Sequence, residues 1–362
     1  MRDKHNLSSF YKGKRVFVTG HTGFKGSWLS AWLLSMGAIV RGFSLDIPTK
    51  PSHFEAIGLS SEMEDVRGDI RDFQAVKKEI QSFQPHHVFH LAAQPIVKTS
   101  YDTPLETFQT NVMGSIHVLE AVRQWNKEQL SNPLRSVVMV TSDKCYENQN
   151  QCMGYRENDP MGGYDPYSAS KGCTELAVSS YQKSFFNNTR IGVASVRAGN
   201  VIGGGDWGQD RLIPDLVRAF STEKSLTLRS PSSIRPWQHV MDPLSGYVLL
   251  GKKLSQEPQT YSGGWNFGPR EVDVATVEEV VQTCIHYWPN HTYQVATDKL
   301  YHETNLLHLD IHKAITLLQW KPTWMLDKAL KTTMEWYQNV TENGFDVAKE
   351  LTYRQIEEFM NE

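Results

Sequence analysis

Five residues of this sequence combine a phenol, a hydroxyl, a carboxylate and two amines in a pattern that suits acid–base chemistry. Tyr167 and Lys171 stand four residues apart in YSASK, a spacing that puts both on one face of a helix. An ammonium so placed lowers the pKa of the phenol and prepares Tyr167 as a general base. Ser142, Asp143 and Lys144 follow one another at the end of the apolar run SVVMVT. These five residues are predicted to share one catalytic site.

Neither signal identifies a site when it is taken alone. The chain has 14 tyrosines, so a Tyr and a Lys four residues apart are expected about once by chance. The segment around Ser142 could instead cap a turn or a helix. The positions of the two segments favour a catalytic role over chance or capping, because both lie near the ends of predicted parallel strands. Open α/β sheets build their sites at the carboxyl ends of such strands.

Alternating strand and helix patterns up to about residue 200 are expected to hold these side chains in place. Short apolar runs predict strands at 15–19, 38–45, 64–69, 87–92, 136–141 and 191–197. Helical patterns cover 72–83, 103 to about 125, and 167 to about 186. The second of these is expected to begin with a capping box made by Thr103 and Glu106 around Pro104. Repeated βα units with uniformly apolar strands predict an α/β fold, a doubly wound parallel sheet covered on both faces.

A glycine-rich segment joins the first strand to the first helix. Gly20, Gly23 and Gly26 there are spaced GxxGxxG, in the loop that also contains Thr22, Phe24 and Lys25. Glycine suits a tight turn, a close approach of the backbone to a pyrophosphate, and close packing of helix on sheet. The helix N-terminus then faces the phosphates. We predict that this segment binds a dinucleotide, the alternative being a turn with a structural role only.

Further cofactor contacts are expected at the ends of the next strands. Asp46 follows Gly26 by twenty residues, where a carboxylate would hold a ribose diol and favour NAD over its phosphorylated form. The alternative is a solvated loop carboxylate. Asp69 and Ile70 are predicted to lie along the adenine edge. Leu91, Ala92 and Ala93 are predicted to let the cofactor lie close to the backbone.

The pattern changes after Asn200, at GGGDWGQD, where segments become shorter and richer in Trp and Pro. We expect an NAD-binding domain at 1–200 and a smaller, mixed substrate-binding lobe at 201–362. Segments around 234–270 are expected to return to the first domain. No long linker separates the two.

Composition narrows the class of protein. The 362 residues are 40% hydrophobic and 21% charged, which is ordinary for a globular protein. A formal net charge of −3 argues against a nucleic-acid partner. The longest nearly apolar stretch, 28–40, is too short to span a membrane. Four cysteines without a CxxC pair favour reduced thiols in a cytoplasmic protein. His86, His87 and His90 alternate faces of a strand, so no metal site is predicted.

Several motifs together resemble a known family. GHTGFKGSWL, TSDKCYEN, YSASK, RAGNVIGGGDW and RPWQHVMDPLSGY are similar to segments of the nucleotide-sugar branch of the extended short-chain dehydrogenase/reductase family. Within that branch the chain resembles most the 4,6-dehydratases that act on CDP-glucose. The likeness runs from about residue 10 to 337. It implies a Rossmann domain with bound NAD, and a homodimer or dimer of dimers formed through the helices at 103–125 and 167–186.

The resemblance also implies roles for the catalytic residues. Tyr167, assisted by Lys171 and Ser142, would take the proton of the glucose 4-hydroxyl while hydride leaves C4 for NAD. Asp143 would protonate the departing 6-hydroxyl. Lys144 stands where related dehydratases have glutamate, so it would remove the C5 proton, with its pKa depressed by burial and by cations such as Lys171. The Asp-Lys pair is typical of the CDP-glucose subgroup. Its alternative is a lysine that only neutralises Asp143.

Substrate contacts are predicted on four further side chains. Arg235 is the first candidate for the diphosphate, with a surface salt bridge as the alternative. His239 would contact a phosphate or ribose unless it has a structural role. Asn200 resembles the residue whose amide donates to the diphosphate in this family, and Gln94 would lie near the hexose. Cytosine recognition is not assigned to any residue.

Two other functions use part of this pattern. An epimerase of the same superfamily would need Tyr167 and Lys171 but not the pair Asp143 and Lys144. A dinucleotide sensor without catalysis would be expected to lose some of the five residues, all of which are present. Dehydration of CDP-glucose to CDP-4-dehydro-6-deoxyglucose is therefore the leading prediction. The family implies that this step opens 6-deoxyhexose and 3,6-dideoxyhexose branches of bacterial surface polysaccharide.

Overall fold

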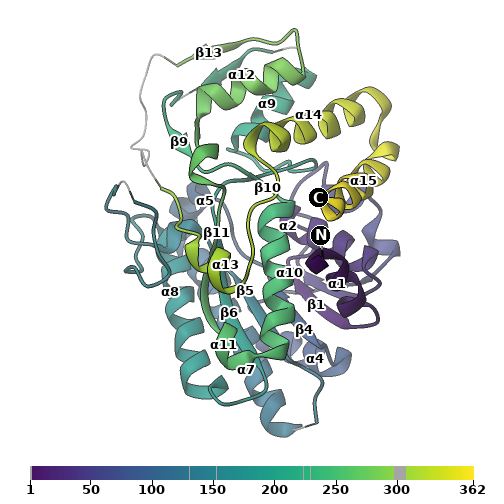
Figure 1. The fold of residues 1–362 in the computed structure, drawn as a ribbon, viewed down its shortest axis with the longest axis vertical. Coiled ribbons are helices and arrows are strands. Elements are labelled where there is room, and N and C mark those ends of the chain that lie inside the picture. The colour runs from purple at the N-terminus through teal and green to yellow at the C-terminus, as the bar shows by residue number, and fades with distance from the viewer. Residues whose placement is uncertain (1, 130, 152, 223, 229, 297–306) are drawn as a thin grey trace.

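A seven-stranded parallel sheet forms the centre of the protein (Figure 1). The computed structural model describes residues 2–129, 131–151, 153–222, 224–228, 230–296 and 307–362. The strands are β1 (Arg15–Thr19), β2 (Ile39–Ser44), β3 (Glu64–Arg67), β4 (His87–His90), β5 (Ser136–Val140), β6 (Gly192–Ala198) and β11 (Gly263–Phe267). Their order is β11-β6-β5-β4-β1-β2-β3. The order reverses at β1, which pairs with both β2 and β4. The predicted doubly wound fold is confirmed.

Helices cover both faces of this sheet, as the uniformly apolar strands require. One layer contains α4 (Phe73–Phe83), α7 (Gly114–Glu128) and α8 (Pro166–Tyr181). Its core packs Val76, Val122 and Val178 against Phe17 and Val137 of the sheet. The other layer contains α2 (Phe24–Ser35) and α10 (Met241–Gln256). Both layers are visible in Figure 1.

The helical segment before α7 differs from the single helix that its pattern predicts. The chain forms α5 (Val97–Asp102), α6 (Pro104–Phe108) and a π-helical turn (Gln109–Met113) before α7 begins. The predicted start at Pro104 is confirmed, but the capping box is wrong. Because α5 precedes directly, the Thr103 hydroxyl donates back to the Thr99 carbonyl at 3.2 Å. Glu106 turns outward and pairs with Arg71 at 3.2 Å.

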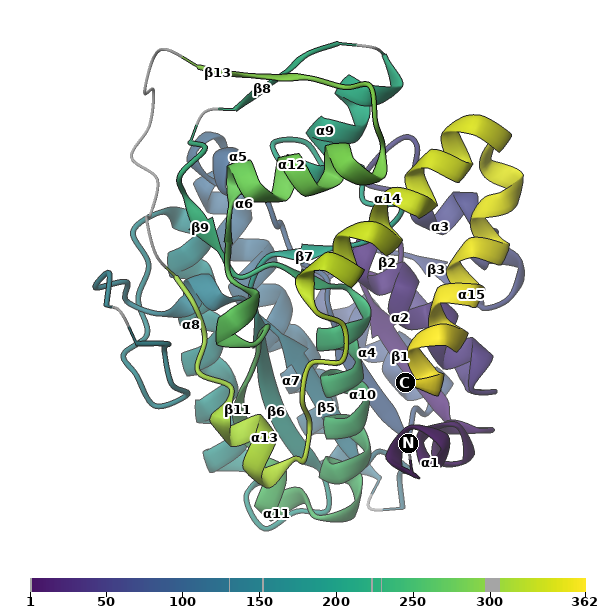
Figure 2. The same cartoon turned by 45° about the horizontal axis from the view of Figure 1, so that its top comes forward.

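Shorter elements after residue 200 form a second group above the sheet (Figure 2). They are β7 (Val201–Ile202), α9 (Leu212–Ser221), β8 (Leu226–Leu228), β9 (Ile234–Arg235), β10 (Gln238–His239), β12 (Ala275–Thr276), α12 (Val277–Tyr287), β13 (Tyr293–Val295) and α14 (Leu326–Asn343). Three two-stranded ribbons join them, β7 with β10, β9 with β12, and β8 with β13. The remaining helices are α1 (Arg2–Tyr11), α3 (His53–Ala56), α11 (Pro258–Tyr261), α13 (His312–Leu317) and α15 (Ala348–Asn361).

The two groups of elements share one core. β11 returns to the central sheet beside β6, and α15 packs on α2. The Trp28 indole donates to the Gly204 carbonyl at 2.9 Å. His53 contacts Ser27 and Thr352 through hydrogen bonds of 2.8 and 3.0 Å. The division at residue 200 stays a prediction, because buried contacts join the two sides of that boundary.

Two points complete the description of the chain. In the part that the structure describes, no helix is long and apolar enough to cross a bilayer. Cys145, Cys173 and Cys284 are free thiols, and Cys152 lies outside the described residues.

Candidate active site

The glycine segment forms a cradle at the carboxyl end of β1. Gly20 has a φ of +73°, and a Cβ there would lie 2.7 Å from the Ala92 nitrogen. A Cβ on Gly26 would lie 2.1 Å from the Gly20 carbonyl oxygen. Both positions therefore require glycine for the fold itself. Gly23 differs, because the nearest atom to its missing Cβ is the Gly20 oxygen at 3.4 Å.

Gly23 is also the N-cap of α2, and no side chain caps that end of the helix. The first turn of α2 thus presents backbone to the same space that the missing Cβ leaves open. An open backbone surface at a helix N-terminus at the sheet's reversal point is where a dinucleotide pyrophosphate binds. The residues of this chain fit such a group.

Other predicted cofactor residues lie along the same edge of the sheet. The Thr19 hydroxyl accepts hydrogen bonds from the Leu91 and Ala92 nitrogens, both at 3.2 Å, which fixes the end of β4 beside the glycine segment. Thr22 and Ser44 hydroxyls are 2.8 Å apart and join the segment to β2. Asp46 is exposed two residues beyond β2, and Ala93 is half-buried.

Asp69 and Ile70 follow β3 and are both engaged by neighbouring groups. Arg71 binds the Asp69 carboxylate through its side chain at 2.6 to 3.0 Å and through its backbone nitrogen at 2.8 Å. The hydrogen bonds from Arg71 hold the pKa of Asp69 below its ordinary value. His117 Nδ1 lies 3.0 Å from the Ile70 carbonyl oxygen. The carboxylate is therefore held in one orientation and ionised, and its contact with the adenine edge stays a prediction.

Helix α8 supplies the predicted phenol and amine. Asp165 caps it by accepting from the Ser168 nitrogen at 2.9 Å, and Pro166 occupies the first turn. Tyr167 and Lys171 are 8% and 5% exposed. Lys171 Nζ lies 5.9 Å from the centroid of the Tyr167 ring and 3.5 Å from the Val140 carbonyl. Burial lowers the pKa of Lys171 to about 8.

The residues after β5 face this helix. Ser142 Oγ donates to Asp143 Oδ1 at 2.9 Å and accepts from the Lys144 nitrogen at 3.3 Å. Lys144 Nζ lies 3.6 Å from the same Asp143 oxygen. A Cβ on Gly199 would stand 3.2 Å from the other Asp143 oxygen, so β6 closes the back of the site. Tyr167, Lys171 and the three residues after β5 thus share one site.

Two electrostatic expectations need correction. Lys144 is not buried, since 37% of its side chain is exposed, and it is paired with Asp143. Burial raises the pKa of Tyr167, and the ammonium that opposes this rise most is that of Lys144, together with a hydrogen bond to Ser142. Lys171 was the expected source of that effect. Its Nζ lies over the ring, 5.9 Å from the centroid.

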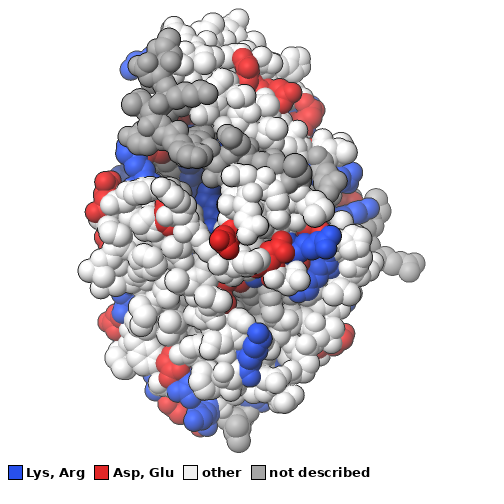
Figure 3. All heavy atoms as spheres, turned by 90° about the vertical axis from the view of Figure 1, so that its left-hand side faces the viewer, with Lys and Arg blue, Asp and Glu red and all other residues white. Residues whose placement is uncertain are grey.

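Two more cations reach this site. Burial lowers the pKa of Lys25 to about 8, and the next largest influences are the charges of Arg211 and Asp143. Arg211 is held by Asp206 at 2.9 Å, and that carboxylate raises its pKa. Lys25 was predicted only as part of the cofactor loop. Arg211 was not predicted; it directly follows the GGGDWGQD segment, whose composition indicates a loop but not where that loop lies. Lys and Arg atoms line a hollow in the upper half of the face that Figure 3 shows.

The four predicted substrate residues have different surroundings. His239 is fully buried between the rings of Trp28 and Trp324, and burial lowers its pKa to about 3. Lobe packing encloses the imidazole, which favours the structural alternative, and the substrate contact of His239 stays a prediction. The Gln94 side chain donates to Thr107 at 2.9 Å and accepts from the Ile96 nitrogen at 2.6 Å. That amide therefore holds its own loop, and this geometry does not support a hexose contact.

Arg235 and Asn200 stay predicted substrate contacts. Arg235 is half-buried in β9, and its Nη1 donates to the Ile234 carbonyl at 3.0 Å. Pro236 follows it and lies against Gly199, beside Asp143. Asn200 is half-buried, and its backbone oxygen accepts from the Gln238 nitrogen at 3.0 Å. Asn200 lies two residues beyond the carboxyl end of β6, and the Pro236 contact brings the end of β9 to the same part of the chain.

The fold and the site define a dinucleotide-binding enzyme of the kind that modifies nucleotide sugars. The family model for GDP-mannose 4,6 dehydratase matches residues 17–333. The chain therefore belongs to this family.

Individual relatives narrow the comparison. The chain is 51% identical over 336 residues to the CDP-glucose 4,6-dehydratase of Salmonella typhimurium, covering 91% of this chain and 92% of that protein. The solved dTDP-glucose 4,6-dehydratase of Streptomyces venezuelae, with NAD bound, has a TM-score of 0.74 at 22% identity and covers 91% and 99% of the two chains. An epimerase from Methanothermobacter thermautotrophicus has a TM-score of 0.78 at 23% identity, covering 94% and 96%. These two structures share the fold.

Proposed function

We propose that this protein dehydrates CDP-glucose to CDP-4-dehydro-6-deoxyglucose. The observation that carries the proposal is the Asp143–Lys144 pair beside Tyr167, because an acid and a base next to the oxidising centre suit elimination of water. An epimerase has no use for such a pair. The cytidine nucleotide is proposed from the 51% identity to the Salmonella enzyme.

NAD is the proposed cofactor, and it would accept hydride from C4 of the sugar and return it to C6. Gly20, Gly23 and Gly26 would hold its pyrophosphate against the first turn of α2. Asp46 would bind the adenosine ribose from the end of β2. Lys171, buried on α8 beside the Tyr167 ring, would donate to the nicotinamide ribose.

Tyr167 would take the proton of the 4-hydroxyl. Its phenol is buried, so the phenolate depends on nearby donors and charges. Ser142 and Lys144 provide these, since both lower the pKa of Tyr167. With the 4-hydroxyl proton on Tyr167, the ketone at C4 acidifies the hydrogen on C5.

Asp143 and Lys144 would carry out the elimination. Lys144 must be neutral to take the C5 proton, and Asp143 must be protonated to release the 6-hydroxyl as water. A single proton transferred from Lys144 to Asp143 produces both forms at once, and the 3.6 Å separation of the two groups permits it. The charge of the pair does not change in this transfer.

The diphosphate of the substrate needs positive charge on a chain whose formal net charge is −3. Arg235 and Asn200 are the proposed contacts, next to the carboxyl end of β6. The half-buried guanidinium of Arg235 suits a phosphate because it offers several donors in a fixed plane.

The decisive experiment incubates the purified protein with CDP-glucose deuterated at C4, and separately with UDP-glucose and dTDP-glucose. We expect loss of water from the CDP sugar alone, with the deuterium found at C6 by mass spectrometry. Conversion without loss of water would establish an epimerase. Bound NAD without conversion of any of the three sugars would support the sensor.

A homodimer or a dimer of dimers is proposed as the assembly. Large apolar side chains are exposed on α5, α6, α8 and the two π-helical turns next to them, Gln109–Met113 and Gln182–Phe186. These side chains are Tyr101, Leu105, Met113, Leu176 and Phe185, at 45 to 71% exposure. These elements contact one another, and a surface patch of this kind marks an interaction site. A sedimenting monomer at micromolar concentration would contradict the proposal.

The cytoplasmic location stays a prediction. The same holds for the place of this step at the start of deoxyhexose branches.

A further inference from the structure

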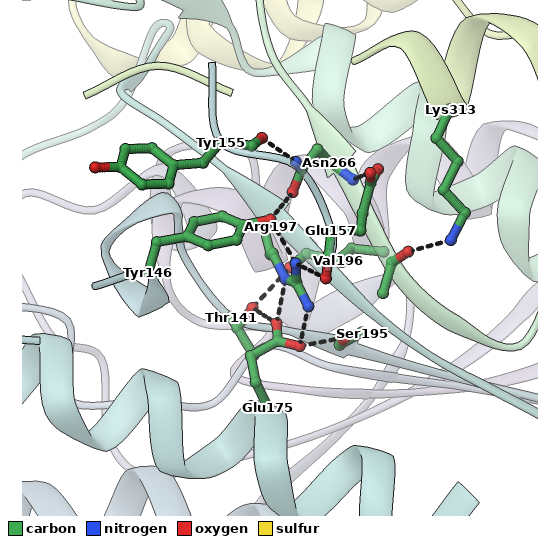
Figure 4. A network of polar contacts seen from close by, with 11 residues as sticks. Thr141, Tyr146, Tyr155, Glu157, Glu175, Ser195, Val196, Arg197, Asn266 and Lys313 are labelled. Carbon is green, nitrogen blue, oxygen red and sulfur yellow. Dashed lines mark hydrogen bonds and ion pairs between the residues drawn. The ribbon is translucent and has the colours of Figure 1, made fainter. Parts of the chain in front are cut away.

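A second polar cluster adjoins the catalytic segments of β5 and α8 along the chain, and we name it the Glu175–Arg197 cluster; its contacts are shown in Figure 4. Its members are Thr141, Tyr146, Glu175, Ser195, Arg197 and Asn266, all buried. Arg197 binds Glu175 through Nε at 2.9 Å and Nη2 at 2.7 Å. This bidentate geometry is the most directional that a guanidinium and a carboxylate make.

The polar groups of this cluster have partners inside the protein. Glu175 also accepts from the Ser195 hydroxyl at 2.6 Å and from the Thr141 hydroxyl. Arg197 Nη1 binds the Tyr146 hydroxyl and donates to the Glu157 carbonyl at 3.2 Å. Tyr146 donates onward to Asn266 at 2.7 Å. Burial alone would raise the pKa of Glu175, but Arg197 and the hydroxyl donors hold it below its ordinary value.

These contacts join both halves of the proposed active site at one carboxylate. Glu175 lies one helical turn beyond Lys171 on α8, and Thr141 directly precedes Ser142. Tyr146 follows Lys144 by two residues. The segment with the acid–base pair is therefore anchored on both sides, at Thr141 and at Tyr146, to the charge pair that also fixes α8.

A buried ion pair is weak evidence for stability, because apolar residues of similar volume often stabilise a core as well or better. Such a pair fixes the relative orientation of the elements that carry it, because each donor must bond to a particular oxygen. We propose that Glu175 and Arg197 form a positioning pair for the dehydration, holding the Ser142–Lys144 segment in register with Tyr167 and Lys171. This inference rests on the proposed function.

Glu175 has an electrostatic effect on the site as well. Its negative charge raises the pKa of Lys171 and so opposes the larger effect of burial. The negative charge of Glu175 therefore favours the ammonium form of Lys171, which the proposed reaction requires. A residue with a purely structural role would not change the pH dependence of the reaction.

The first test compares substitutions at the two ends of strand β5. Thr141→Val removes the hydroxyl contact to Glu175 at the carboxyl end of β5, and Thr141→Ser keeps it. Ser136→Ala is the matched control, because Ser136 is buried at the other end of β5 and its hydroxyl bonds His87 at 2.7 Å. We expect Thr141→Val to lower kcat about tenfold with KM changed less than about twofold. Thr141→Ser should restore kcat, and Ser136→Ala should leave it near wild type.

Amide hydrogen exchange of the ligand-free protein gives a readout that needs no substrate. Thr141→Val should speed exchange in the segment 142–157 about tenfold, whereas Ser136→Ala should not. Equal exchange and equal kinetics in Thr141→Val and Ser136→Ala would overturn the inference. If the wild type does not convert CDP-glucose, the proposed function fails, and the exchange result still decides whether the cluster positions the segment.

The second test concerns charge. Glu175→Gln keeps the shape but leaves Arg197 unneutralised, so the pKa of Lys171 should fall. The decline of kcat/KM at high pH should then begin about one pH unit lower than in the wild type. Glu175→Asp keeps the charge and should keep the wild-type profile in pH even if kcat falls. An unchanged profile in a folded Glu175→Gln protein would contradict the inference.

Discussion

Helix α8 contributes residues to two polar clusters that have opposite effects on the ionisation of their buried groups. The catalytic cluster, made of Lys25, Asp143, Lys144, Tyr167, Lys171, Asp206 and Arg211, contains four cations and two carboxylates. Burial lowers the pKa of Lys171 to about 8 there, so the charged amine is disfavoured. In the Glu175–Arg197 cluster the pKa of Glu175 is below its ordinary value, so the charged carboxylate is favoured.

The difference separates what the protein needs for chemistry from what it needs for a fixed geometry. Excess positive charge in the catalytic cluster is unfavourable in the empty protein and becomes favourable when anionic substrate and cofactor bind. The second cluster has matched charges and internal partners, so its contribution does not depend on a ligand. Substitutions in the first cluster should therefore lower activity by orders of magnitude with little loss of stability, whereas substitutions in the second should lower activity about tenfold or less and also destabilise the fold.

The largest contrast is expected between two tyrosines. Tyr167→Phe removes the general base and should lower kcat about 10³-fold with little change in stability. Tyr146→Phe removes a hydroxyl that binds Arg197 and Asn266, and it leaves both buried groups short of a partner. It should lower the free energy of unfolding by about 1–3 kcal/mol and kcat less than about tenfold. Turnover and urea unfolding of the two variants measure this. A similar profile for both would remove the distinction between the clusters.

The next effect concerns the elimination step alone. Asp143→Asn keeps an acceptor for Ser142 but removes the acid, so dehydration should slow about 10²-fold. Oxidation at C4 should persist, and CDP-4-ketoglucose that retains its 6-hydroxyl should be recovered after a rapid quench. Asp165→Asn is the control, because asparagine also caps a helix such as α8. If Asp143→Asn dehydrated at the rate of the control, Asp143 would not be the acid.

The sequence was sufficient for the fold because its strands are short, apolar and regularly separated by helices. It was sufficient for Tyr167, Lys171 and the segment after β5 because these residues follow strands whose ends must meet. The capping box at Thr103 failed because α5, which the pattern does not reveal, offers that hydroxyl another acceptor. Arg211 was missed because nothing local shows that its loop returns over the site.

The Glu175–Arg197 cluster shows more clearly what local sequence patterns do not predict. Glu175 falls at a helical position that reads as solvated, and Arg197 interrupts an otherwise apolar strand. Each is unremarkable alone, and only tertiary contact between α8 and β6 pairs them. The enclosure of His239 has a related origin, since the rings that surround it come from α2 and the segment before α14. Contacts between distant segments are not encoded in local spacing.

A smaller effect is expected at Lys171, where replacing a catalytic residue should raise the free energy of unfolding. The pKa of Lys171 is about 8 in the folded chain and has its ordinary value of 10.5 when unfolded. Below pH 8 the folded chain therefore holds a charge in an unfavourable place, and that cost disappears as the pH rises towards 10.5. Lys171→Met should abolish activity yet raise the free energy of unfolding by about 2 kcal/mol at pH 7. Urea unfolding at pH 7 and pH 10 should show the advantage shrinking. An advantage that does not change with pH would mean that packing, and not charge, is its source.

The smallest expected change in the free energy of unfolding is that of Gly23→Ala. Its φ of −76° suits alanine, and the added Cβ would meet no protein atom closer than the Gly20 oxygen at 3.4 Å. Gly23→Ala should therefore leave the free energy of unfolding within about 0.5 kcal/mol of wild type. If a pyrophosphate occupies the space that this glycine leaves open, the methyl group should weaken NAD binding about tenfold, measured by calorimetry. Gly26→Ala is the contrasting variant, because its Cβ would lie 2.1 Å from the Gly20 oxygen and should unfold the segment. Unchanged NAD affinity in Gly23→Ala would move the pyrophosphate away from the first turn of α2, and the open backbone there would lose its role in binding.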